Sequence, residues 1–160
     1  MNENKSKSIV IGEKAPDFTA TVQNPLSTET ITLSTILSQN TKVLLVFYPG
    51  DDTSGCTAQL CGIRDIYKEF TDLGVLVLGV NPADSQSHLN FINKYSYPFG
   101  IVVDSDKSIR EKYGAIGNFY GKIITRRCVF LIDTDSTVIF RHFGQQDNNK
   151  ILDLLKTLTK

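Results

Sequence analysis

The chain has 160 residues, of which 41% are apolar and 21% charged, and this composition is typical of one soluble globular domain with a buried core. Seventeen acidic residues balance seventeen basic ones, so we expect binding to neither nucleic acid nor an anionic membrane. The polar N-terminus has no apolar signal region, and the longest apolar runs, 43–48 and 75–80, are far too short to span a bilayer. These features predict a cytoplasmic protein whose three cysteines are reduced.

The N-terminal part of the chain is polar and rich in turn signals. We expect residues 1–8 to form a disordered tail and residues 9–160 to form a single domain. Within that domain, residues 9–35 hold short strand candidates separated by turns at Pro16 and Pro25.

The next part of the chain alternates between strands and helices. Continuous β-prone runs at 43–48 and 75–80 predict central strands that are buried on both faces. Between them, apolar residues spaced three and four apart predict a helix from Thr57 to about Asp72, which Gly74 ends.

The second half of the chain continues this alternation and ends in a hairpin and a helix. We predict, in order, a helix at 85–95, a strand at 101–103, a short helix at 107–112, a loop at 114–125, strands at 128–132 and 137–141, and an amphipathic helix at 151–158. This order is typical of an α/β fold with a central mixed sheet that helices cover on both faces.

The first reactive candidate is Cys56, which lies between the strand at 43–48 and the helix that follows it. In open α/β sheets, ligands bind beyond the carboxyl ends of the strands, and Cys56 lies there. The positive end of a helix favours the thiolate, which is the nucleophilic form. Cys56 also precedes Leu60 by four residues on the apolar stripe, so a buried structural cysteine is an equally good interpretation of this residue alone.

The second candidate, Cys61, follows Cys56 by five residues. In an ideal helix this spacing gives about 7.5 Å of rise and about 140° of rotation, which separates the two Cα atoms by about 8.6 Å. A disulfide needs less than roughly 7 Å, so the pair can bond only if the first turns unwind. The spacing is not the C-x-x-C of a thioredoxin-type reductase, and two divergent thiols make a poor metal site. Two unrelated helix cysteines remain an open interpretation of the spacing.

Pro49, Thr53 and Cys56 form the pattern P-x-x-x-T-x-x-C, which resembles the active-site motif of the peroxiredoxin superfamily. The wider string FYPGDDTSGCTAQLCGIRD is similar to the branch known as bacterioferritin comigratory protein, or Q-type peroxiredoxin. The resemblance covers most of the chain and includes GEKAPDF at 12–18, Gly79-Val80 followed by a turn and His88, Tyr97-Pro98-Phe99, and Arg127 ahead of FLID at 130–133.

The resemblance implies a thioredoxin-like fold and a thiol-dependent peroxidase that acts on hydrogen peroxide and organic hydroperoxides. Cys56 would attack the peroxide and become a sulfenic acid, and Cys61 would then form an intramolecular disulfide with it. Thr53 would orient the peroxide, Pro49 would shield the thiolate from water, and Arg127 would stabilise the thiolate and the leaving oxygen. We expect thioredoxin or a similar dithiol as the reductant, no cofactor and no metal, and a monomer or a weak dimer.

Four other residues have less specific interpretations. Cys128 alternates with apolar neighbours in a predicted core strand, so we expect a buried structural thiol. His88 and His142 lie outside the motif, and we expect them at the surface or packed against a helix. Arg126 points to the opposite sheet face from Arg127, because side chains alternate along a strand.

Two other functions fit parts of the pattern. A thiol-disulfide oxidoreductase with the same kind of fold would use Cys56 and Cys61 on protein disulfides, although their spacing and Thr53 disfavour this function. A non-catalytic module would leave Cys56 with ordinary thiol reactivity, which the alkylation rate at pH 6 would reveal.

Overall fold

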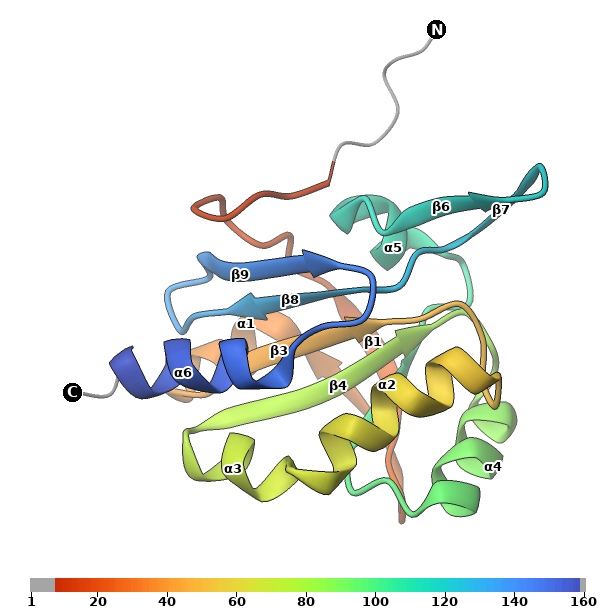
Figure 1. Ribbon diagram of the computed structural model, residues 1–160, viewed down its shortest axis with the longest axis horizontal. Helices are drawn as coiled ribbons and strands as arrows, with labels where there is room; N and C mark the ends of the chain where they lie inside the picture. Colours follow the sequence, from red (N-terminus) through yellow and green to blue (C-terminus); the bar gives the residue numbers. More distant parts are fainter. Residues whose placement is uncertain (1–7, 159–160) are drawn as a thin grey trace, which may run out of the picture.

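The computed structural model describes residues 8–158 apart from the side chain of Cys56, so residues 1–7 of the predicted tail lie outside the described part. A central sheet is flanked by helices (Figure 1). It has seven strands in the order β2-β1-β5-β4-β3-β8-β9. Its strands are β1 (Thr19–Gln23), β2 (Thr28–Thr32), β3 (Lys42–Phe47), β4 (Val75–Asn81), β5 (Gly100–Val103), β8 (Cys128–Ile132) and β9 (Val138–Phe143).

An interior strand of this sheet, β3, pairs parallel with β4 and antiparallel with β8. Residues 43–48 are all 0% exposed, as expected for a continuous apolar strand that is covered on both faces. The five strands predicted from 43–48 onward are confirmed within three residues at each end, and all of them belong to this one mixed sheet.

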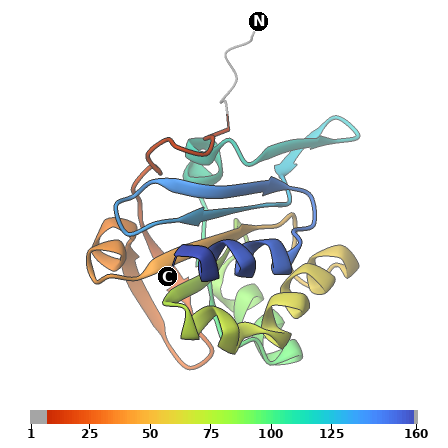
Figure 2. The same ribbon diagram turned by 60° about the vertical axis from the view of Figure 1, so that its left-hand side comes forward.

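Side chains alternate along β3 and divide the core into two clusters. Leu44 and Val46 belong to one cluster, whereas Leu45 and Phe47 belong to the other. Helices cover both faces of the sheet, as predicted (Figures 1 and 2). The first face packs against α2 (Ser54–Asp65), α3 (Tyr67–Asp72), α4 (Ser85–Tyr95) and α6 (Asn148–Leu158), and the second against α1 (Leu33–Ser38) and α5 (Ser108–Tyr113).

The predicted helix at 57–72 differs from the structure in two ways. It begins at Ser54, three residues earlier, and it is interrupted at Ile66, where φ is −123° and ψ is 21°. The interruption divides the segment into two helices, while Ile63 of α2 and Phe70 of α3 both stay fully buried in the same cluster. The apolar stripe identified the helical segment but not this interruption.

The predicted loop at 114–125 is wrong, because it contains a hairpin of β6 (Ile116–Phe119) and β7 (Lys122–Thr125). The two turn residues, Tyr120 and Gly121, have φ of 51° and 80°, which suits a two-residue hairpin turn. Tyrosine is uncommon at positive φ, so the sequence carried only a weak hairpin signal here. The short helix α1 was also missed.

No helix within residues 8–158 is long and apolar enough to cross a membrane.

Candidate active site

The loop between β3 and α2 carries the predicted motif to one edge of the sheet. Tyr48 is still fully buried, Pro49 is half-buried, and Thr53 is exposed at the N-terminus of α2. Asp52 has a φ of 58°, in the left-handed region, which marks a tight turn within the loop. The loop therefore presents the start of α2 beyond the carboxyl end of β3.

Cys56 lies in the first turn of α2, as predicted. The first helical hydrogen bond runs from the Thr57 N–H to the Thr53 carbonyl at 2.8 Å, so Ser54, Gly55 and Cys56 form the turn whose N–H groups have no acceptor within the helix. This is the positive end of the helix dipole. The side chain of Cys56 lies outside the described part of the structure, so the predicted contacts of its sulfur stay predictions.

The guanidinium of Arg127 lies against this first turn. A Cβ atom on Gly55 would come within 2.8 Å of Nη2 of Arg127, so a larger residue at this position would displace the end of the arginine side chain. Nη1 of Arg127 donates a hydrogen bond of 2.9 Å to Oε1 of Gln59, one turn along α2. The neighbouring Arg126 lies over the ring of Phe143 at 4.1 Å, on the other side of the sheet. The predicted alternation of the two arginines is therefore confirmed.

Gln59 is a site residue that sequence reasoning missed. It is 0% exposed, although the other buried residues in the described part of this helix, Leu60 and Ile63, are apolar. Its carbonyl oxygen fixes Arg127, and its Nε2 has no hydrogen-bond partner within the described residues. A polar residue one turn after a reactive cysteine was the available signal.

Cys61 is half-buried on α2 and packs against the cluster that α2, α3, α4 and α6 share. Its Sγ lies 3.4 Å from the hydroxyl oxygen of Tyr97, which follows α4 in the chain. Because Cys56 and Cys61 both lie in the uninterrupted helix α2, the ideal-helix separation of about 8.6 Å between their Cα atoms applies to this state. A disulfide between them requires the intervening turns to open.

Cys128 lies on the opposite face of the sheet from Cys61. It is 0% exposed in the second cluster, and its Sγ contacts the carbonyl oxygen of Arg126 at 3.4 Å. Burial raises the pKa of its thiol to about 12, so it is neutral at physiological pH. The prediction that Cys128 is buried is confirmed.

A buried polar network anchors the loop through Asp51. Its Oδ1 accepts a hydrogen bond of 2.7 Å from the Tyr48 hydroxyl, and its Oδ2 accepts one of 2.6 Å from the Ser87 hydroxyl. Nδ1 of His88 lies 2.8 Å from the same Oδ2, and Nε2 lies 3.2 Å from the carbonyl oxygen of Asn81. Both of these partners present acceptor oxygens, so the His88 ring links the loop to the end of β4.

This network corrects one of the alternatives for His88. Surface exposure is wrong, because the His88 side chain is 0% exposed, whereas packing of α4 is confirmed. His142 is exposed, as expected. Asp51 and His88 are separated by 36 intervening residues, so their pairing depends on how α4 packs beside the loop.

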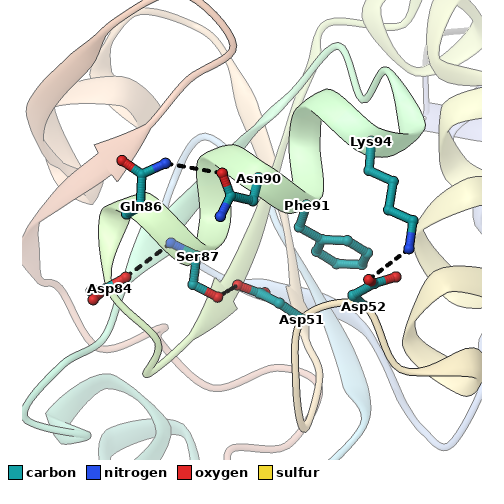
Figure 3. Close-up of a pocket in the computed structure, with 8 residues that line it drawn as sticks. All are labelled: Asp51, Asp52, Asp84, Gln86, Ser87, Asn90, Phe91 and Lys94. Carbon is teal, nitrogen blue, oxygen red and sulfur yellow. Dashed lines mark hydrogen bonds and ion pairs between the residues drawn. The ribbon is translucent and has the colours of Figure 1, made fainter.

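A cleft of about 370 Å³ lies between this loop and α4 (Figure 3). Asp51 and Ser87 meet inside it, and Lys94 reaches across to Oδ2 of Asp52 at 2.8 Å. The Tyr95 hydroxyl donates to the other oxygen of Asp52, also at 2.8 Å. Two consecutive carboxylates thus join the active-site loop to α4.

Burial alone would raise the pKa of Asp51, but the hydrogen bond and charge of His88 and the hydroxyls of Ser87 and Tyr48 outweigh it. The pKa of Asp51 is therefore below its ordinary value of 3.8. A depressed carboxyl pKa contributes stability above the unfolded pKa, and this stability is lost as the pH falls through the folded pKa.

A thioredoxin-like sheet with a cysteine in the first turn of α2 and an arginine against that turn defines a thiol-dependent redox enzyme. Residues 11–141 match the model of the AhpC/TSA family. A bcp peroxiredoxin of Coxiella burnetii is 37% identical over 135 residues, which cover 82% of this chain and 86% of the relative. Peroxiredoxin Q of Arabidopsis thaliana chloroplasts is 33% identical over 89% of this chain, and the match spans 63% of the longer relative.

The solved structures agree with this relationship. Peroxiredoxin Q of Xanthomonas campestris has a TM-score of 0.78 and 25% identity, and the match covers 89% of this chain and 92% of that chain. BcpB of Mycobacterium tuberculosis has a TM-score of 0.79 and 25% identity, with coverage of 92% and 96%. The chain belongs to the AhpC/TSA family, and its relatives identify it as a thiol-dependent peroxidase of the peroxiredoxin type.

The buried network gives a prediction about stability. Asp51→Asn keeps the shape of the side chain but removes the charge opposite His88, so we expect a loss of about 1–3 kcal/mol in the free energy of unfolding at pH 7. Urea denaturation measures this loss. Asp52→Asn is the matched control, because its pair with Lys94 is exposed to solvent and should contribute less.

The difference between wild type and Asp51→Asn should also shrink as the pH falls below 3.8, because the wild-type carboxylate is then being protonated. Equal destabilisation by Asp51→Asn and Asp52→Asn, or a difference that does not change with pH, would contradict this role for Asp51.

Proposed function

We propose that this protein reduces hydrogen peroxide and organic hydroperoxides with Cys56 as the attacking thiolate and Cys61 as the resolving thiol. The observation that carries the proposal is the placement of Cys56 in the first turn of α2 with the Arg127 guanidinium against the same turn. The helix end and the cation both favour the thiolate over the thiol.

In the first step, the Cys56 thiolate attacks the terminal peroxide oxygen. A sulfur–oxygen bond forms, the oxygen–oxygen bond breaks, and water or an alcohol leaves after taking up a proton. Arg127 stabilises the charge that develops on the leaving oxygen, and Gln59 holds its guanidinium in place. The Thr53 hydroxyl donates to the Gly50 carbonyl at 3.2 Å, which leaves its oxygen able to accept a hydrogen bond from the peroxide.

In the second step, the Cys56 sulfenic acid and the Cys61 thiol form a disulfide and release water. Thioredoxin or a similar dithiol then reduces the disulfide. Cys128 takes no part, since it is buried on the opposite sheet face with a raised pKa. Pro49 shields the thiolate from water. We propose that residues 9–160 work as one cytoplasmic domain, as a monomer or a weak dimer.

Serine variants separate the two steps. Cys56→Ser should reduce peroxide consumption to the uncatalysed rate, because it removes the nucleophile. Cys61→Ser should consume one equivalent of peroxide at the wild-type rate and then stop turning over with thioredoxin, because no disulfide can form. Cys128→Ser, the matched control, should turn over normally.

Stopped-flow measurement of the first peroxide equivalent, followed by steady-state turnover with thioredoxin, distinguishes these outcomes. Normal turnover by Cys61→Ser would show that Cys61 is not an obligatory resolving residue. Insulin reduction without peroxide consumption by the wild type would favour a thiol-disulfide oxidoreductase instead.

Helix stability should set the rate of disulfide formation. Substitutions at two positions of α2, one exposed and one with room for a Cβ atom, test this. A Cβ atom on Gly62 would meet only Nδ2 of Asn148, at 3.4 Å, so alanine fits there with little strain. Gly62→Ala should stabilise the helix by about 1 kcal/mol and slow disulfide formation about fivefold. Ala58→Gly, at an exposed position between the two cysteines, should accelerate it by a similar factor.

Rapid-quench mass spectrometry of the disulfide measures both variants, and the rate of the first peroxide step is the internal control. Changes of the same sign in the two variants, or no change in either, would contradict a requirement for helix opening.

A further inference from the structure

The Cys61 thiol has a polar contact that the peroxidase chemistry leaves unassigned. Its Sγ lies 3.4 Å from the Tyr97 hydroxyl oxygen, and the Tyr97 residue is only 2% exposed. Within the described residues, Cys61 is the side chain that pairs with this hydroxyl. A buried hydroxyl without a partner is costly, so the contact stabilises the folded position of Cys61.

Tyr97 itself is held rigidly. Its ring stacks on Phe99 at a centroid distance of 5.2 Å and meets Phe91 edge-on at 5.1 Å. Its backbone N–H donates to the Ile92 carbonyl of α4 at 3.1 Å. The hydroxyl is therefore held in place beside α4, and it cannot follow Cys61 when α2 opens.

A second contact lies one turn beyond Cys61. Nη1 of Arg64 donates to the Tyr95 carbonyl, at the end of α4, at a distance of 2.7 Å. This bond holds α2 from Arg64 onward, a part of the helix that does not have to move for the disulfide to form. The hydroxyl of Tyr97 instead holds the residue that does have to move.

We propose that the Tyr97 hydroxyl is a positioning group that retains the Cys61 thiol in folded α2 and so limits the rate at which the Cys56–Cys61 disulfide forms. This proposal rests on the function proposed above. The reaction it delays joins the two sulfurs and breaks the sulfur–oxygen bond of the Cys56 sulfenic acid. Hydroxide leaves and takes the Cys61 thiol proton as water, while the Cys61 sulfur is oxidised and the Cys56 sulfur is reduced.

The alternative role for Tyr97 is to accept the proton of Cys61 and so accelerate the step. Burial and the hydrogen bond to Cys61 raise the pKa of the Tyr97 phenol above its ordinary value, which keeps it protonated. A neutral phenol donates to the sulfur readily but is a poor base. The contact therefore favours retention of Cys61 and not its activation.

Retention of Cys61 has a chemical consequence. While the Cys56 sulfenic acid waits, a second peroxide can oxidise it to the sulfinic acid, which does not form the disulfide. Tyr97 thus sets the partition between recycling and inactivation at high peroxide.

Tyr97→Phe in the full chain tests the proposal, because it removes the hydroxyl and keeps the ring. We expect disulfide formation to be about three- to tenfold faster, which is the change expected for the loss of one hydrogen bond. Rapid-quench mass spectrometry measures this rate. The first peroxide step should stay within about twofold of wild type, and the sulfinic fraction at high peroxide should fall. Tyr67→Phe is the matched control, since its ring packs on Phe99 in the same aromatic cluster, whereas the hydrogen bond of Cys61 within the described residues goes to Tyr97.

A second readout is independent of turnover. In a Cys56→Ser background, Tyr97→Phe should raise the alkylation rate of Cys61 by iodoacetamide, whereas Tyr67→Phe should not. Slower or unchanged disulfide formation in Tyr97→Phe would overturn the proposal, as would equal acceleration in Tyr67→Phe. If peptide mapping finds no Cys56–Cys61 disulfide in the wild type, the assignment of Cys61 fails and the role of Tyr97 fails with it.

Discussion

Two cysteines five residues apart in one intact helix cannot form a disulfide, and this constraint governs how the site must work. The first turn of α2 gives Cys56 the positive helix end and the neighbouring guanidinium of Arg127. The same helix keeps Cys61 about 8.6 Å away, measured between Cα atoms of an ideal helix. The folded helix therefore suits attack on peroxide, and the opened helix suits disulfide formation. Under the proposed mechanism, the protein needs both local states, with oxidation shifting the balance between them.

The helix α4 stays in place while the first turns of α2 open. At one end of the site, Asp51 and Asp52 of the active-site loop bond to side chains of α4. At the other, Tyr97 and the Tyr95 carbonyl contact Cys61 and Arg64 of α2. The loop before α2 and the end of α2 are thus both held, so opening can be confined to the turns between the cysteines. The central strands can keep their hydrogen bonds throughout.

Much of this fold was predictable because its strands are continuous apolar runs, and α4 was predicted with its observed bounds at Ser85 and Tyr95. The motif likewise predicted Cys56, Thr53 and Arg127 as site residues from local patterns, and the Arg127 guanidinium lies against the first turn of α2. The sequence could not reveal which side chains meet across long separations. The contact of Cys61 with Tyr97 depends on the packing of α4 beside α2, and so does the burial of His88, which was expected at the surface or against a helix. Contacts between residues far apart in the chain leave no periodic pattern in the sequence from which they could be predicted.

Amide hydrogen exchange across the cysteine-bearing turns, in the reduced and the oxidised protein, tests the opening of α2 most directly. Reduced protein should protect residues 57–62 through the helical hydrogen bonds, and oxidation should remove that protection. The strands β3 and β8 should keep theirs in both states, since each is an interior strand that is paired on both sides. Equal protection of residues 57–62 in both states, with the Cys56–Cys61 disulfide confirmed by mass spectrometry, would show that the helix never has to open.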